Sequence, residues 1–127
     1  MSAILDVLRG SDVPETDRQR FLTAQLLFWL LAAPDGHAKN FSIFIEPEGR
    51  YRLTPLYDIM SAWPVIGDGP KMFQWQKLKL AMAVRAKNAH YQMYTFSADT
   101  GTRWLRQTGW ARTLNLSFNS SLPKHLT

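Results

Sequence analysis

The spacing of apolar and polar positions predicts two helices followed by a short β-hairpin. Residues 1–10 show helical spacing of their apolar side chains and end at a glycine, where a helix can stop. A second helix is expected to start at a capping box, Thr16–Gln19, and to run to about Ala33, where Pro34 ends it. Its last turns, residues 26–31, are apolar all round, which predicts that this end is buried.

A hairpin is predicted next. Residues 40–45 alternate in the manner of a strand, residues 46–49 have turn chemistry, and residues 51–55 carry the chain back. Because a hairpin returns its second strand to the start of the first, we expect Asn40 and the segment ending at Asp58 to lie close together.

The pattern is weaker beyond the hairpin. Residues 60–70 contain prolines and glycines and are expected to form a loop. Residues 77–80 alternate, but residues 81–86 suit a helix. The loop is expected to be anchored by three apolar residues, Trp63, Val65 and Ile66.

Composition is that of a single folded domain. The chain has 127 residues, 46% of them apolar, and no cysteine, which excludes a disulfide framework and a thiolate zinc site. There is no basic segment followed by an apolar run at the N-terminus, so no signal peptide is predicted. The longest apolar stretch, Phe21–Ala33, has 13 residues, whereas a membrane span needs about 20. We therefore expect a cytoplasmic protein without a membrane partner.

Charge is unevenly distributed. The formal net charge is +5, but residues 1–70 carry a net charge of −3 and residues 71–127 a net charge of +8. A basic second half could contact DNA or an acidic partner. A solvated basic surface is an equally good interpretation.

Three side chains with oxygen atoms, Asp35, Asn40 and Asp58, are candidate functional residues. Asn40 follows Asp35 by five residues, and the hairpin should bring Asp58 to both. Carboxylate and amide oxygens suit Mg²⁺, and the same parts recur in phosphoryl-transfer sites: a catalytic Asp, an Asn five residues on, and a later Asp.

Simpler interpretations of these residues remain open. Asp35 could be a turn residue, because Asp-Gly is a favoured turn pair. Asp58 lies in an apolar sequence context and would need a metal or a basic partner if buried, and Arg50 or Arg52 could supply a salt bridge.

Two motifs carry a family resemblance. They are Asp-Gly-His-Ala-Lys-Asn at residues 35–40 and Tyr-Arg-Leu-Thr-Pro-Leu-Tyr-Asp-Ile at residues 51–59. Residues 21–66, extended to about residue 90, resemble the C-terminal lobe of HipA-type toxin kinases. The resemblance implies a cytoplasmic serine/threonine kinase from a toxin–antitoxin pair. It also implies a mainly α fold with a small β-hairpin, the C-terminal lobe of a two-lobed, protein-kinase-like fold whose N-lobe is absent.

The resemblance also implies roles for single residues. Asp35 would be the catalytic base, and Asn40 and Asp58 would hold Mg²⁺. His37 and Lys39 would lie on the phosphates of ATP, so that these two residues with Asn40 and Asp58 would form the nucleotide and metal site.

Part of the family's nucleotide site has no counterpart here. No glycine-rich loop stands before Asp35, and no lysine stands before Lys39. We therefore expect half of an active site, in a core at residues 1–93, followed by a divergent, basic and loosely ordered segment at residues 94–127. The expected partners are a protein substrate from the translation machinery, a small DNA-binding antitoxin and a separate N-lobe.

Two other functions are compatible with the sequence. The first is a truncated, inactive lobe that acts only by binding a partner. The second is a metal-dependent phosphoesterase that uses the Asp35-Gly36-His37 sequence and Asp68, but a two-metal site needs more ligands, and only His90 and His125 are left.

Overall fold

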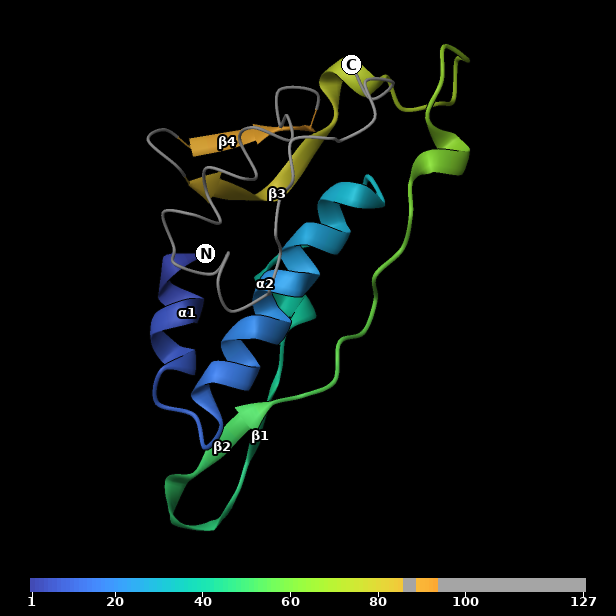
Figure 1. Ribbon diagram of the computed structural model, residues 1–127. Helices are drawn as coiled ribbons and strands as arrows, with labels where there is room; N and C mark the ends of the chain where they lie inside the picture. The colour runs from blue at the N-terminus through green and yellow to red at the C-terminus, as the bar shows by residue number, and fades with distance from the viewer. Residues whose placement is uncertain (86–88, 94–127) are drawn as a thin grey trace, which may run out of the picture.

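The described part of the chain forms two helices and two small antiparallel sheets, followed in Figure 1 from blue to orange. The computed structural model describes residues 1–85 and 89–93, so the predicted loose segment at 94–127 and His125 lie outside the described residues. The elements are α1 (Ser2–Leu8), α2 (Pro14–Leu30), β1 (Ile43–Ile45), β2 (Tyr51–Leu53), β3 (Lys79–Arg85) and β4 (Ala89–Gln92). Short 3₁₀ turns lie at Ala38–Asn40, Pro47–Gly49, Trp63–Val65 and Trp75–Lys77.

The expectation of a mainly α fold is wrong. Residues 81–86 were expected to suit a helix, but residues 81–85 belong to β3, which pairs antiparallel with β4. Leu78 and Leu80, two residues apart, are both buried, which is strand spacing. Residues 54–78 add two 3₁₀ turns and one isolated β-bridge, between Ile66 and Phe73. In this part of the chain, pairing between the two strands therefore outweighs local helix propensity.

The start of α2 also differs from the prediction. The helix begins at Pro14 with Val13 as its N-cap, and no side chain caps it. Proline suits the first helical position because its φ is already helical and its missing N–H would have had no partner there. The predicted Thr16–Gln19 capping box is therefore inside the helix rather than at its start.

The end of α2 comes earlier than predicted. The helix ends at Leu30, and Ala32 takes a left-handed φ of 50°. The N–H of Ala33 donates to the Phe28 carbonyl at 2.8 Å, and the N–H of Ala32 donates to the Trp29 carbonyl at 3.1 Å. This is the Schellman pattern, formed here with alanine in the place usually taken by glycine. Burial of this end is incomplete, since Leu30 is 51% exposed.

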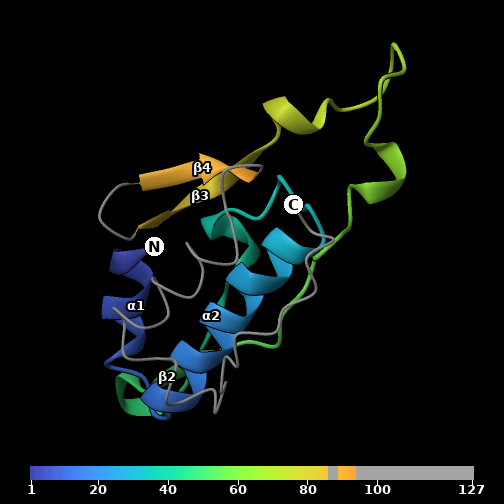
Figure 2. The same cartoon turned by 45° about the horizontal axis from the view of Figure 1, so that its top comes forward.

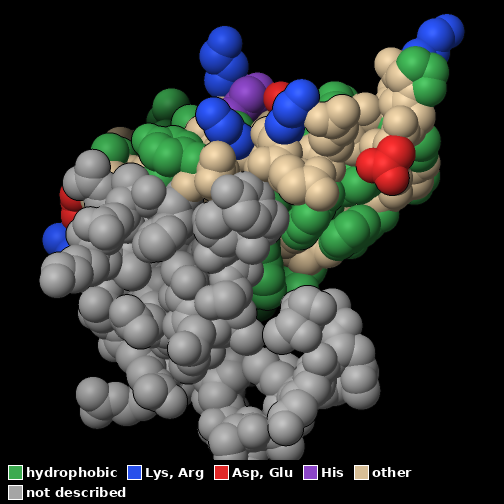
Figure 3. Space-filling view, turned by 90° about the horizontal axis from the view of Figure 1, so that it is seen from above, with side chains coloured by type: hydrophobic (Ala, Val, Ile, Leu, Met, Phe, Trp, Pro, Cys, Tyr) green, Lys and Arg blue, Asp and Glu red, His purple; other side chains and the backbone are tan. Residues whose placement is uncertain are grey.

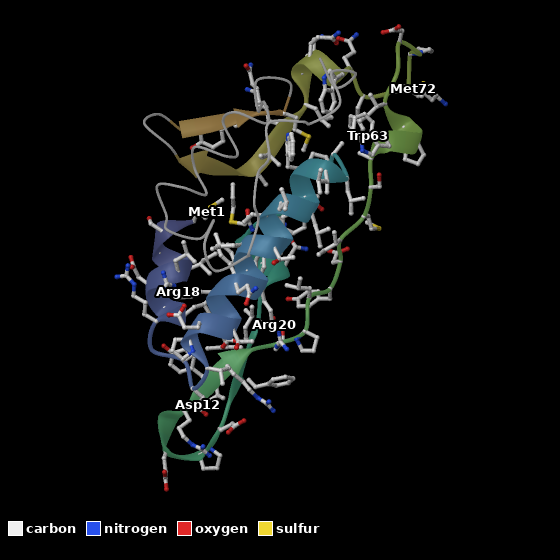
Figure 4. All side chains as sticks on the ribbon, in the orientation of Figure 1. Met1, Asp12, Arg18, Arg20, Trp63 and Met72 are labelled. Atoms are coloured by element: carbon white, nitrogen blue, oxygen red, sulfur yellow. The ribbon has the colours of Figure 1, made fainter. Side chains whose placement is uncertain are left out.

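Carbonyls at the end of α2 are capped by residues that come after the hairpin. Trp63 Nε1 donates to the Leu30 carbonyl at 2.8 Å. The N–H of Ala62 and the Oγ of Ser61 donate to the Leu31 carbonyl, at 3.1 and 3.0 Å. Figure 4 shows Trp63 beside this end of the helix. Trp63 thus anchors the loop as predicted, although its ring, like Val65, is largely exposed.

The hydrophobic core lies along α2, with α1 beside it and the β3–β4 hairpin across its upper end (Figures 1 and 2). No helix among the described residues is long and apolar enough to cross a lipid bilayer. The buried core residues are Leu8, Phe21, Leu22, Ala24, Phe28, Ala32, Ala33, Leu53, Leu78, Leu80 and Met93.

The predicted hairpin at residues 40–55 is confirmed. β1 and β2 are antiparallel, with Ile43 opposite Leu53 and Ile45 opposite Tyr51. Its turn contains two residues with positive φ, Gly49 as expected and also Glu48. No strand pairs with the outer edge of β1 in the described part of the chain, and Ile45 on that strand is 77% exposed.

Candidate active site

The loop that leaves α2 is pressed onto that helix at Gly36. A Cβ atom added at Gly36 would lie 2.4 Å from ring carbons of Phe28, a buried residue of α2. Only glycine allows the backbone to approach the ring so closely. The loop therefore leaves the helix end along a fixed path, and it presents Asp35 to solvent with 85% of its side chain exposed.

Asn40 is fixed to the same helix by its neighbour. Phe41 packs edge-on against Phe21, with ring centroids 4.8 Å apart, and against Phe28 at 6.1 Å. Edge-to-face aromatic pairs of this kind add stability beyond the apolar area that they bury. Asn40 itself is buried, so its amide is held at the base of the loop.

The structure brings Asn40 and Asp58 into contact. Asn40 Nδ2 donates to Asp58 Oδ2 at 2.8 Å, across 18 residues of sequence. On the other side of the amide, Asn40 Oδ1 accepts the backbone N–H of His37 at 3.0 Å. These two bonds define which atom of the amide is oxygen, and they leave one lone pair of Oδ1 available.

Asp58 is exposed rather than buried, contrary to the sequence context. Its backbone takes a left-handed φ of 57°. The proposed salt bridge to an arginine does not form: Arg50 lies 3.6 Å from Asp12 and 3.4 Å from Glu46, and Arg52 lies 3.3 Å from Glu46. The carboxylate of Asp58 is therefore held by the Asn40 amide instead of an arginine.

Tyr57 is a site residue that sequence reasoning missed. Its hydroxyl donates to the Lys39 carbonyl at 3.1 Å and shares a hydrogen bond of 2.7 Å with Ser42 Oγ. Because a hydroxyl has one proton, Ser42 is the donor in the second bond. These bonds join Tyr57, the residue before Asp58, to Lys39 and Ser42, which lie on either side of Asn40 in the sequence. The only signal in the sequence was a tyrosine at the end of the predicted hairpin.

The other two predicted residues lie at the edge of this cluster. His37 Nε2 is 3.7 Å from Asp35 Oδ1, and His37 Nδ1 is buried without a hydrogen-bond partner among the described residues. The side chain of Lys39 is exposed. Asn40 and Asp58 are thus joined directly, His37 links them to Asp35, and Lys39 contributes only its carbonyl to the bonds described above.

The donors present fit a magnesium ion that is shared with a substrate. Asn40 Oδ1 and the Asp58 carboxylate are the hard oxygen ligands that Mg²⁺ takes, and Mg²⁺ is commonly held by one or two carboxylates together with substrate phosphates. In the part of the chain that the structure describes, no three His, Cys, Asp or Glu side chains are grouped so as to hold a metal by themselves. The pair is therefore suited to a metal that arrives with phosphates, and not to the two-metal site of a phosphoesterase.

Comparison with known families agrees with the motifs in this loop and hairpin. Residues 1–120 match the family model described as HipA-like C-terminal domain. The chain belongs to this family. The match continues past residue 93, and the division into a core at 1–93 and a divergent segment at 94–127 stays a prediction.

Proposed function

We propose that this member of the HipA-like C-terminal domain family supplies the catalytic-loop half of a serine/threonine kinase. The reaction would be ATP- and Mg²⁺-dependent phosphoryl transfer to a protein hydroxyl, carried out in the cytoplasm by the toxin of a toxin–antitoxin pair. The protein substrate would come from the translation machinery, and the antitoxin would be a small DNA-binding protein.

One observation carries the proposal. Asn40 and Asp58 meet at 2.8 Å although 18 residues separate them, and the loop that holds Asn40 also presents Asp35 to solvent. This arrangement supports the proposal because a phosphoryl-transfer site combines a catalytic loop with a metal-binding segment. If Asp35 were only a turn residue after the helix, the contact between Asn40 and Asp58 beside it would have no purpose.

Each side chain has a defined task in this proposal. Asp35 accepts or orients the proton of the attacking hydroxyl, for which its exposure is required. Asn40 Oδ1 and the Asp58 carboxylate would hold Mg²⁺, which supplies neutralisation of the phosphate charge when it is bound. His37 and Lys39 would lie along the nucleotide phosphates, where a loop lysine acts as a point charge.

An inactive lobe that only binds a partner is the second candidate. Residues 1–34 contain one glycine, Gly10, and no lysine, so they hold neither a glycine-rich phosphate loop nor a lysine for the phosphates. By the resemblance, these two parts belong to an N-lobe. The basic residues 71–127 are then the surface expected to meet DNA or an acidic partner.

Calorimetric titration of Mg²⁺-ATP separates the preformed half-site from no site. The wild-type chain is expected to bind, Asp58→Ala to lose binding, and Asp35→Asn to bind like the wild type. Asp35→Asn is the matched control because it changes another exposed carboxylate of the candidate site that is not a proposed metal ligand. Binding that survives in Asp58→Ala would contradict the assignment of this residue.

Reconstitution separates the kinase from the inactive lobe. A phosphotransfer assay on a seryl or threonyl protein is run with the chain alone and with a kinase N-lobe added in trans. Activity that appears only with the added lobe and is lost in Asp35→Asn supports a half-kinase. Mg²⁺-ATP binding without transfer under either condition supports the inactive lobe.

A further inference from the structure

Asp17 is a fully buried carboxylate that the proposed chemistry does not use. It lies in the first turns of α2, and its side chain has 0% exposure. Oδ2 accepts the backbone N–H of Leu53 at 2.8 Å, and Oδ1 has no partner among the described residues. Burying a carboxylate is costly, so its one strong contact indicates what it does.

The hydrogen-bond pattern of the hairpin explains why Leu53 needs this acceptor. The bonded pairs include Ser42 with Thr54 and Glu46 with Arg50. In an antiparallel ladder bonded and non-bonded pairs alternate, so Leu53 forms a non-bonded pair with Ile43. The N–H of Leu53 therefore points away from β1 and toward α2. Without the carboxylate of Asp17 it would be a buried donor with no acceptor.

Asp12 and Asp17 together bond the outer edge of β2. The backbone N–H of Asp12 donates to the Tyr51 carbonyl at 2.9 Å on the same outer edge. Figure 4 shows Asp12 beside this end of the hairpin. The outer edge of β2 is thus hydrogen-bonded to the start of α2, first by a backbone group and then by the buried carboxylate.

Asp58 lies between two attachments of the same chain segment to α2. Upstream, Leu53 is held by Asp17 near the start of the helix, and downstream, Ala62 is held by the Leu31 carbonyl just past its end. These helix positions are about 21 Å apart at 1.5 Å per residue. The chain from Leu53 to Ala62 spans at most about 30 Å when fully extended. The segment that carries Asp58 must therefore stay about 70% extended. Figure 1 shows it running alongside the helix.

We propose that Asp17 is a positioning residue for the Asn40–Asp58 site. By holding the N–H of Leu53, it fixes the hairpin and the segment that follows it on α2, the same helix from which Asp35 emerges. The metal-binding pair is thereby set relative to Asp35. The metal-binding role of Asn40 and Asp58 rests on the proposed function, whereas the positioning of the hairpin by Asp17 does not.

Three variants of the full chain test the proposal. Asp17→Leu removes the acceptor at similar volume, and Asp17→Asn keeps an oxygen for Leu53 and places an amide at the unpartnered Oδ1. Gln25→Leu is the matched control, because Gln25 is a buried polar residue of α2 whose Nε2 has no partner in the described residues. If Asp17→Leu does not fold, Asp17→Ser, whose shorter side chain ends before Leu53, takes its place.

The readouts are amide hydrogen exchange at Leu53, the amide shift of Asp58 and the affinity for Mn²⁺, read from paramagnetic broadening. Loss of the acceptor should speed exchange at Leu53 at least about tenfold and weaken Mn²⁺ binding by about tenfold, the size expected when an outer-shell support is lost. Asp17→Asn should restore both, and Gln25→Leu should leave both unchanged.

Unchanged Leu53 exchange, or unchanged Mn²⁺ affinity, in a folded variant without the acceptor overturns the proposal. If the wild type does not bind Mn²⁺, the metal assignment of Asn40 and Asp58 fails, and exchange at Leu53 and the Asp58 amide shift decide the positioning role alone. A shift that moves in Asp17→Leu and returns in Asp17→Asn then supports it, and a shift that stays in place overturns it.

Discussion

At the scale of single residues, the backbone of Asp58 matters as much as its carboxylate. Its φ of 57° lies in the left-handed region, which side chains other than Gly, Asn and Asp rarely adopt. The conformation is held by neighbours on both sides, through the hydroxyl of Tyr57 and the attachments of Ser61. Non-glycine residues kept in this region are frequent at functional sites.

Asp58→Gly should therefore be more stable than Asp58→Ala, by about 1 kcal/mol, because glycine adopts this φ without steric cost. Both variants should lose Mg²⁺-ATP binding equally, since neither has the carboxylate. Urea unfolding measures the first difference and calorimetry the second. Equal stability of the two variants would mean that Asp58 is not left-handed in solution.

Gly36→Ala should lower the free energy of unfolding by about 1–3 kcal/mol, the usual cost of overpacking a well-packed site. The added methyl would meet the Phe28 ring at 2.4 Å, and the ring is buried. Gly67→Ala is the control, because its nearest atom is the sulfur of Met72 at 2.9 Å, at the far end of a flexible side chain. Urea unfolding of both variants gives the comparison, and a similar small effect in both would contradict the tight approach at Gly36.

At the scale of elements, α2 is the base on which the site is built. Its start holds β2 through Asp17, its middle holds Phe41, and its end is capped by residues 61–63. Helix ends leave carbonyls that need donors, and here the donors come from the segment that follows Asp58. The helix and the site are therefore stabilised by the same contacts.

Variants of two tyrosines distinguish the stability of the hairpin from the placement of the site. Tyr57→Phe removes the bonds to Lys39 and Ser42, and Tyr51→Phe removes a bond of 2.6 Å to the Val7 carbonyl of α1. Each should cost about 1 kcal/mol in urea unfolding, a typical value for a hydrogen bond. Only Tyr57→Phe should also weaken Mn²⁺ binding. Equal affinity in both variants would show that Tyr57 has no part in placing Asp58.

Sequence patterns predicted some of these elements and missed others for physical reasons. The hairpin was predictable because its alternation and its turn are local features, and its closure follows from antiparallel geometry. The strand at Lys79–Arg85 was not, because its alanines suit a helix and no proline or glycine stands between it and β4 to signal a turn. The end of α2 was placed late because Ala32, not glycine, takes the left-handed position.

The same division applies to the candidate site. The contact between Asn40 and Asp58 followed from the hairpin, which is a statement about backbone geometry. The exposure of Asp58 and the support from Tyr57 and Asp17 depend on how the hairpin packs on α2, which the local pattern does not contain.

At the scale of the whole molecule, an arm at residues 60–77 extends from the upper end of α2, and hydrophobic side chains show on its surface at the right of Figure 3. Trp63 holds the arm in two ways, by its bond to Leu30 and by stacking on Trp75 with ring centroids 5.1 Å apart. The exposed apolar residues of the arm include Met60, Trp63, Val65, Met72 and Phe73.

Trp63→Ala should loosen this arm more than the rest of the fold. We expect several-fold faster trypsin cleavage after Lys71 and Lys77, with a loss of about 1–2 kcal/mol in unfolding free energy from the stack and the hydrogen bond. Trp63→Phe, which keeps a ring and loses the N–H, should be intermediate. Unchanged cleavage at both lysines in Trp63→Ala would show that Trp63 does not secure the arm.

The outer edge of β1 has a consequence for how the protein behaves at high concentration. Among the described residues no strand pairs with this edge, and Ile45 beside it is exposed, so the edge can pair with the same edge of another molecule. Pro47 and Glu48, which lie in the turn after the strand, are residues of the kind that oppose such pairing. Self-association should therefore begin at this edge, and Ile45→Lys should raise the concentration at which light scattering first increases.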